Sequence, residues 1–162
     1  MATSLDSLLQ ILRAHGWTVS FAESCTGGHL SSVLTAEAGI SDVFMGSVVS
    51  YSNKAKTELL GVRPETLLAK GAVSESVALE MAGGAREKFH TNWSIAITGI
   101  AGPSGGTPEK PVGTVCFAVS GRWDLEERNR SATCHFDGDR NSIQSQSVEY
   151  AIGMLVAEMK KK

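Results

Sequence analysis

Residues 21–28, FAESCTGG, bring a carboxylate, two hydroxyls and a thiol together beside two glycines. The apolar run before them, WTVSFA at residues 17–22, predicts a strand, and the spacing after them predicts a helix over residues 26–37. Unpaired N–H groups converge where a helix begins after a strand, and α/β proteins place substrates there. We therefore predict that the chemistry of this chain is centred here, with Ser24 as a nucleophile.

A structural role for Ser24 is equally compatible with this pattern, because a serine near a helix start commonly accepts a hydrogen bond from a free N–H group. A serine hydroxyl is also inert at neutral pH without a base. No histidine follows in a triad pattern and the sequence GxSxG is absent, which argues against α/β-hydrolase chemistry. The base for Ser24 must therefore be another kind of residue.

The sequence YSNKAK at residues 51–56 contains a candidate base. If its Ser-Asn pair caps a helix, Lys56 lies in the first turn, where the helix dipole disfavours an ammonium group. Burial would lower the pKa of Lys56 in the same direction, towards a neutral amine. Lys54 is expected on the opposite face, in solvent. The pattern alone also permits a surface role for Lys56 and a rim position for Tyr51.

The glycine-rich stretch TGIAGPSGG at residues 98–106 directly follows a predicted strand and resembles a phosphate cradle of bare main-chain amides. It lacks the GxxxxGK[ST] pattern of a nucleoside-triphosphate loop, and a tight surface turn is the alternative. Residues 109–113 form a second polar approach to the next strand. Arg140, at the start of the last predicted helix, is either a partner for an anion or a solvent-exposed side chain.

The three cysteines, an odd number without CxxC spacing, predict free thiols and a reducing cytoplasm. Cys25 is a rival nucleophile to Ser24, although a small thiol is more often a buried packing residue. The four histidines are scattered and form no HExxH motif, so no metal site is predicted.

The 162 residues are expected to form one domain, residues 1–162, with the composition of an ordinary soluble globular protein. A net charge of −2 gives no footprint for nucleic acid, and no apolar run is long enough to cross a membrane. The first residues do not resemble a secretion signal. These observations predict a cytoplasmic protein without a nucleic-acid or membrane partner.

The remaining pattern predicts a mixed sheet covered by helices on both faces. The glycine pair in the helix over residues 75–89 indicates either close packing or a kink. The expected helices cover residues 4–15, 26–37, 53–60, 64–70, 75–89 and 140–160. The expected strands are residues 17–22, part of 43–51, residues 93–98, and a hairpin of 112–119 and 125–136 turned by residues 120–122.

Six sequence blocks, in order, resemble one family. They are AESCTGG (22–28), YSNKAK (51–56), GAVS (71–74), TGIAGPSGG (98–106), KPVGTV (110–115) and GDR (138–140). Over residues 5–158 the chain is similar to the CinA C-terminal domain family, whose stand-alone members, of the PncC type, are nicotinamide-nucleotide amidohydrolases. The N-terminal domain of full-length members has no counterpart here, so a pyrophosphatase activity of that half is not expected.

This resemblance implies a three-layer α/β/α fold and hydrolysis of nicotinamide mononucleotide to nicotinate mononucleotide and ammonia, without metal or organic cofactor. By motif, Ser24 would be the nucleophile, Lys56 the base and Tyr51 an assisting proton relay. The expected substrate-binding residues are Glu23, Thr26, Gly27, Gly28, Thr98, Gly99, Gly102, Gly113 and Arg140. A nucleotide-binding or weakly active family member is the alternative. We also expect a homo-oligomer, and the sequence leaves open which loop holds the phosphate.

Overall fold

The computed structural model describes residues 3–161, in which five strands form one mixed sheet. The order across the sheet is β2-β1-β3-β4-β5. The strands are β1 (Val19–Glu23), β2 (Phe44–Val49), β3 (Trp93–Gly99), β4 (Thr114–Trp123) and β5 (Glu126–His135). Because β1 runs parallel to both β2 and β3, the carboxyl ends of these three strands share one edge of the sheet. The other two strands join antiparallel.

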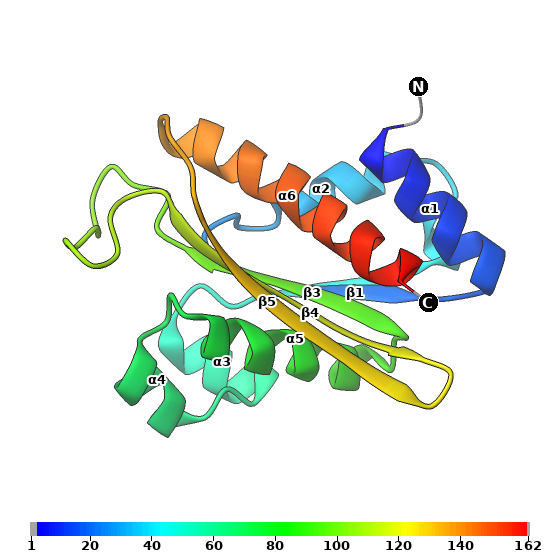
Figure 1. Ribbon diagram of the computed structural model, residues 1–162, viewed down its shortest axis with the longest axis horizontal. Helices are drawn as coiled ribbons and strands as arrows, with labels where there is room; N and C mark the ends of the chain where they lie inside the picture. The colour runs from blue at the N-terminus through cyan, green and yellow to red at the C-terminus, as the bar shows by residue number, and fades with distance from the viewer. Residues whose placement is uncertain (1–2, 162) are drawn as a thin grey trace.

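Helices cover both faces of this sheet, as Figure 1 shows. One layer holds α1 (Ser4–His15), α2 (His29–Thr35) and α6 (Arg140–Lys160). The other layer holds α3 (Asn53–Leu60), α4 (Pro64–Lys70) and α5 (Glu75–Phe89). A short 3-10 helix, η1 (Ile40–Asp42), precedes β2. The predicted α/β fold with a mixed sheet between two helical layers is thus confirmed.

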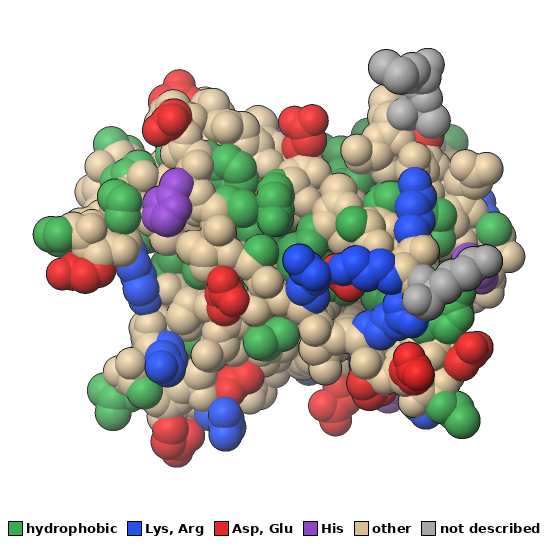
Figure 2. Space-filling view, viewed as in Figure 1, with side chains coloured by type: hydrophobic (Ala, Val, Ile, Leu, Met, Phe, Trp, Pro, Cys, Tyr) green, Lys and Arg blue, Asp and Glu red, His purple; other side chains and the backbone are tan. Residues whose placement is uncertain are grey.

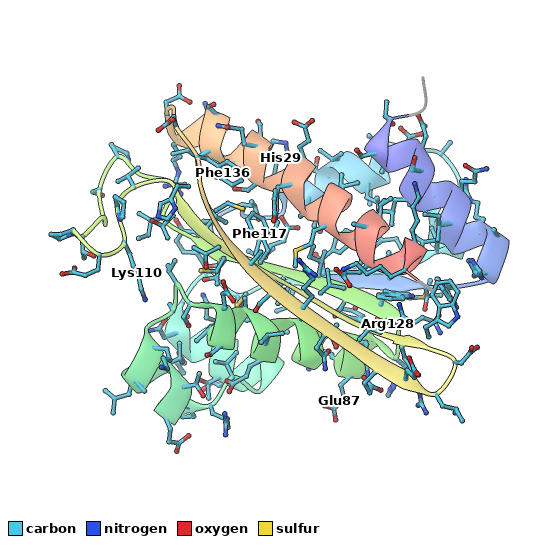
Figure 3. All side chains as sticks on the ribbon, viewed as in Figure 1. His29, Glu87, Lys110, Phe117, Arg128 and Phe136 are labelled. Carbon is cyan, nitrogen blue, oxygen red and sulfur yellow. The ribbon has the colours of Figure 1, made fainter. Side chains whose placement is uncertain are left out.

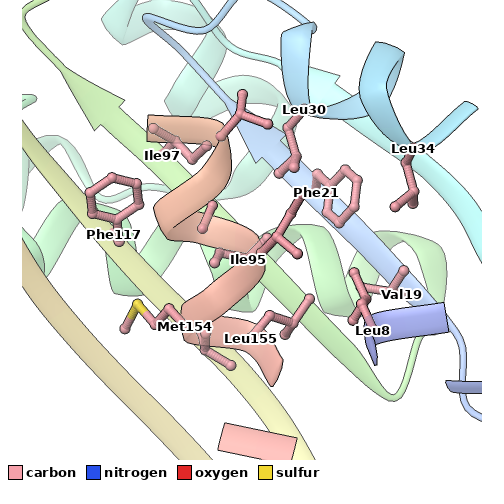
Figure 4. Close-up of a cluster of buried hydrophobic side chains, with 14 of the residues drawn as sticks. Leu8, Val19, Phe21, Leu30, Leu34, Ile95, Ile97, Phe117, Met154 and Leu155 are labelled. Atoms are coloured by element: carbon pink, nitrogen blue, oxygen red, sulfur yellow. The ribbon is translucent and has the colours of Figure 1, made fainter. Parts of the chain in front are cut away.

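The two faces of the sheet carry side chains of different size. Towards α6 the strands present large side chains such as Phe21, Ile95 and Phe117, which share one buried cluster with Leu155 of that helix (Figure 4). Towards α5 the same strands present small side chains; these are Ala22, Ala96, Cys116 and Ala118. Small residues on the strands and on the facing side of α5 allow this helix to lie close to the sheet.

The glycine pair in α5 serves close packing at one of its two positions. A Cβ atom on Gly84 would lie 1.9 Å from the carbonyl oxygen of Leu60, at the end of α3. A Cβ atom on Gly83 would meet nothing within 4 Å. Since α5 runs as one helix from Glu75 to Phe89, the close-packing interpretation is confirmed for Gly84.

Several predicted boundaries hold and others, among them those of β1, α2 and β4, are wrong. The structure confirms the predicted helices α1, α3, α4, α5 and α6. The predicted turn at residues 120–122 does not form, because β4 continues to Trp123 and the hairpin turns at residues 124–125. Gly121 provides space rather than a turn, since a Cβ atom there would lie 2.0 Å from the ring of Trp93.

The predicted helix over residues 26–37 is also shorter, beginning at His29 and ending at Thr35. Gly27 and Gly28 adopt left-handed φ angles of 56° and 101°, which keeps the chain out of the helix until His29. The strand before it likewise occupies Val19–Glu23 and not residues 17–22.

Ion pairs add to the apolar contact between α6 and β5. Figure 2 shows Lys and Arg side chains gathered near the C-terminal end of α6, where it lies beside β5. There Glu158 pairs with Arg130 of β5, at 3.3 Å, and with Lys161. Among the helices of residues 3–161, none is long and apolar enough to cross a membrane.

Candidate active site

An open cleft of about 310 Å³ lies at the edge where the parallel strands end. Its walls come from the end of β3 and the segments after β1, β2 and β3, from the start of α3, from the link between α4 and α5, and from the start of α6. The lining residues are Ser24, Cys25, Tyr51, Asn53, Lys56, Ala72, Val73, Thr98, Gly99, Ile100, Ala101, Gly102, Ser104, Gly105 and Arg140. No side chain in this set is a carboxylate.

Ser24 and Lys56 meet at the base of the cleft. Ser24 directly follows β1, and its N–H donates to the carbonyl of Ile97 at 3.0 Å, which extends the strand pairing to Ser24. Lys56 lies in the first turn of α3, the helix that Ser52 caps. The Lys56 Nζ atom is 3.0 Å from Ser24 Oγ and donates to the carbonyl of Ser50 at 2.7 Å.

The surroundings of Lys56 favour its neutral form. Its side chain is 1% exposed, and this burial lowers the pKa of the amine, with a smaller opposing effect from Cys25. None of the ion pairs formed within residues 3–161 includes Lys56. Lys54, two residues earlier, is 80% exposed, as the helical spacing predicts, and it pairs with Glu58.

Cys25 also lines the cleft, but as a protonated thiol. It is buried, and burial raises its pKa to about 11. A thiolate is the reactive form of cysteine, so at neutral pH this side chain is a poor nucleophile. The raised pKa of Cys25 and the contact of Ser24 with Lys56 therefore favour Ser24 over Cys25 as a nucleophile.

Glu23 and Thr26, both expected at the substrate, instead lie under the start of α2 in this structure. The Glu23 carboxylate is buried and accepts from the N–H groups of Leu30, at 2.9 Å, and Ser31, at 3.1 Å. The hydroxyls of Thr26 and Ser31 donate to it as well, at 2.8 and 2.6 Å. Glu23 thus takes the place of a side-chain cap, which Gly28 cannot provide.

Tyr51 and Arg140 meet at the mouth of the cleft. Arg140, the first residue of α6, donates to the carbonyl of Gly102 at 2.8 Å and to the Tyr51 hydroxyl at 2.9 Å. Tyr51 is 63% exposed, and within residues 3–161 its hydroxyl makes no hydrogen bond to Ser24 or Lys56. The structure thus brings Tyr51 to the cleft through Arg140.

The other predicted binding residues divide into two groups. Thr98, Gly99 and Gly102 line the cleft, and the Thr98 hydroxyl donates to the carbonyl of Ala72 at 2.9 Å. The residues outside the lining are Glu23, Thr26, Gly27, Gly28 and Gly113. A Cβ atom on Gly113 would lie 2.0 Å from the carbonyl oxygen of Phe136, so this glycine serves a close main-chain approach.

The glycine-rich loop is also held from outside the cleft. Figure 3 shows Lys110 pointing from the end of this loop towards the α4 layer, where its Nζ atom donates to the carbonyl of Lys70 at 2.7 Å. This contact ties the loop to the helix layer that supplies Lys56.

Two contributors to the site do not appear in the sequence analysis. Ser50 acts through its main-chain carbonyl, for which no residue type gives a signal. Gln144 donates from α6 to the carbonyl of Cys25 at 2.8 Å. Its spacing of four from Arg140 places both side chains on one face of α6, which is the signal that would have found it.

The fold and the site define an α/β protein with a buried serine–lysine pair at the carboxyl ends of its parallel strands. The sequence model of the CinA C-terminal domain family matches residues 2–159 of this chain. A CinA-like protein of Fervidobacterium nodosum is 51% identical over 150 residues, covering 93% of this chain and 36% of that protein. Another, of Mycolicibacterium paratuberculosis, is 49% identical over 152 residues, covering 93% and 35%. The chain thus spans about a third of the length of these relatives.

Solved structures match over nearly their whole length. The competence or damage-inducible protein of Enterobacter asburiae superposes with a TM-score of 0.90 at 36% identity, covering 99% of this chain and 100% of that one. The competence/damage inducible protein CihA of Agrobacterium tumefaciens gives 0.87 at 40% identity, covering 98% and 96%. The chain belongs to the CinA C-terminal domain family.

Proposed function

We propose that this protein is an amidohydrolase that converts nicotinamide mononucleotide to nicotinate mononucleotide and ammonia. The observation that carries the proposal is the 3.0 Å contact between Ser24 Oγ and the buried Lys56 amine. An uncharged amine at that distance is a general base for a serine hydroxyl, which a binding protein does not need.

In the first half of the reaction, neutral Lys56 takes the proton of Ser24 while Oγ attacks the carboxamide carbon. The bond that forms joins Ser24 to the substrate, and the carbonyl oxygen becomes an oxyanion. Stabilisation of this oxygen by main-chain N–H groups is worth about 3 kcal/mol for each donor. The proton then passes from Lys56 to the departing nitrogen, the C–N bond breaks, and ammonia leaves.

In the second half, a water molecule attacks the acyl-enzyme. Lys56 is neutral again after giving its proton to the departing nitrogen, so it accepts a proton from this water. The ester bond to Ser24 then breaks as Lys56 returns that proton to Ser24 Oγ, and the acid leaves. Tyr51 is assigned an assisting role in proton transfer by the family resemblance. Tyr51 also accepts a hydrogen bond from Arg140, which offers it a second role in holding the Arg140 guanidinium at the mouth of the cleft.

The charges around the cleft support an anionic substrate. Arg140 is the cation at the mouth, and the lining contains no carboxylate that would repel a phosphate. A guanidinium group presents several donors in a plane that suits phosphate oxygens. The nucleotide phosphate is therefore assigned to the side of the cleft formed by Arg140 and the loop after β3.

The proposal predicts the effect of removing either member of the pair. Ammonia release from nicotinamide mononucleotide should fall at least about 1,000-fold in Ser24→Ala and in Lys56→Met, because each removes a group that acts in every turnover. Lys54→Met is the matched control, since it removes an exposed lysine from the same helix, and it should keep near-normal turnover.

Three results would contradict the proposal in whole or in part. Near-normal ammonia release by Ser24→Ala would reject the serine as nucleophile, and loss of activity in Cys25→Ala alone would transfer that role to the thiol. Binding of the nucleotide by wild-type protein, measured by calorimetry, with no ammonia formed would favour the alternative of a nucleotide-binding family member.

A further inference from the structure

Two successive peptide groups after Ser24 have their carbonyls held in place. The Ser24 carbonyl accepts from the N–H of Gly27 at 3.0 Å, and the Cys25 carbonyl accepts from the side-chain amide of Gln144 at 2.8 Å. In a trans peptide the C=O and the following N–H point in opposite directions. Fixing these two carbonyls therefore fixes where the N–H groups of Cys25 and Thr26 point.

In the described part of the chain, no carbonyl of the main chain accepts from either of these two N–H groups. A buried N–H group normally finds an acceptor, so adjacent free donors next to a nucleophile are suited to a negative oxygen. Gly27, in the same turn, fixes the direction of the Cys25 N–H. The direction of the Thr26 N–H depends instead on Gln144, a side chain of α6.

We propose that Gln144 is a positioning residue for amide hydrolysis: its hydrogen bond to the Cys25 carbonyl turns the Thr26 N–H towards the oxyanion formed at Ser24. The inference rests on the proposed function. Gln144 lies on the α6 face of the sheet, and Lys56 reaches Ser24 from the opposite layer. A carbonyl turned towards α6 directs the next N–H away from that helix, to the side from which the base approaches. The Thr26 side chain binds Glu23 outside the cleft lining, so only the main-chain N–H of Thr26 is assigned to the oxyanion.

The position of Gln144 on α6 suits this task. Arg140, one turn earlier, fastens the loop after β3 and Tyr51, and Gln144 fastens the turn after Ser24. Below them Ile143 and Ser147 are buried, so the helix is a rigid support. A donor held by such a support keeps its direction through the reaction, which electrostatic stabilisation of an oxyanion requires.

Substitution of Gln144 by methionine tests the inference, because methionine has a similar length and no donor. We expect Gln144→Met to lower kcat about 10- to 100-fold with KM changed less than about twofold, since the oxyanion exists only after binding. Gln146→Met is the matched control. Gln146 lies on the same helix and also donates to a carbonyl, that of Asp137, outside the cleft, so kcat and KM should stay near wild type.

A second readout does not depend on the nucleotide. A fluorophosphonate probe reacts when Ser24 Oγ forms a bond to phosphorus, fluoride leaves, the serine proton passes to Lys56, and the phosphoryl oxygen gains negative charge. Mass spectrometry gives the labelling rate of Ser24, which should fall in Gln144→Met and in Gln144→Glu, whose carboxylate cannot donate. Thermal unfolding of each variant checks that it is folded.

The outcomes separate the two proposals. Equal kcat and equal labelling rates in Gln144→Met and wild type would overturn the role of Gln144 and leave the amidohydrolase standing. A wild-type protein that labels at Ser24 but releases no ammonia would contradict the substrate, while slower labelling of Gln144→Met would still support the positioning role. A wild-type protein that neither labels nor releases ammonia would overturn both.

Discussion

At the scale of single residues, the site depends on one amine whose burial disfavours its charged form. The Nζ atom of Lys56 donates to the carbonyl of Ser50, and the Ser24 hydroxyl is its other partner. A neutral amine has a single lone pair, and the donation to Ser50 leaves that pair available for the Ser24 proton. The carbonyl of Ser50 therefore orients the base as well as binding it.

The pH dependence of turnover follows from the lowered pKa of Lys56. Activity requires the neutral amine, so kcat/KM should rise with pH and reach its plateau below 10.5, the ordinary pKa of a lysine. Ammonia release measured between about pH 6 and pH 11 tests this. Cys25 cannot account for a rise below pH 10, because its pKa is raised to about 11. A rate that begins to rise only near pH 10 would contradict a buried neutral lysine.

At the scale of elements, the sequence predicts what is local and misses what depends on a neighbour. The start of α3 at Ser52 and the place of Lys56 in its first turn follow from capping and spacing, and both are confirmed. The length of β4 does not follow from local sequence. Gly121 is a residue typical of turns, but here it lies within the strand against the ring of Trp93. The start of α2 likewise depends on a neighbour, because its cap is the Glu23 carboxylate at the end of β1.

The glycine pair of α5 gives a direct test of element packing. Gly84→Ala should lower the free energy of unfolding by about 3 kcal/mol, because its Cβ would overlap the carbonyl of Leu60. Gly83→Ala, one residue away in open space, should raise it by about 1 kcal/mol through helix propensity. Urea unfolding of both variants measures the difference, and two variants of equal stability would show that α3 and α5 yield at this contact.

At the scale of the whole molecule, the cleft draws on both helical layers. The layer below the sheet supplies Lys56 through α3, and the layer above supplies Arg140 and Gln144 through α6 (Figure 1). Ser24 lies between them, directly after β1, an interior strand of the sheet. The residue types and motifs indicated most of these side chains, but contacts across 32 or 119 residues, such as Lys56 with Ser24 and Gln144 with Cys25, arise only from the packing of layers.

The buried amine should also affect the stability of the whole fold. Between the lowered pKa of folded Lys56 and its value of 10.5 when unfolded, the unfolded chain binds one more proton, so the free energy of unfolding rises with pH across that range. At pH values below this range, the buried amine lowers the free energy of unfolding of the wild type by about 1.4 kcal/mol for each unit by which the two pKa values differ. Lys56→Met loses nothing of this kind, so we expect it to be inactive but more stable than the wild type near pH 7.

The difference between the two proteins identifies the cause. Their gap in the free energy of unfolding should be widest at low pH and should close as the pH approaches 10.5, where the unfolded amine also becomes neutral. The raised pKa of Cys25 affects both proteins, so it largely cancels in the difference. Urea unfolding from about pH 6 to pH 10 measures the gap. A gap that stays constant over this range would mean that Lys56 keeps an ordinary pKa, and the serine would then have no base.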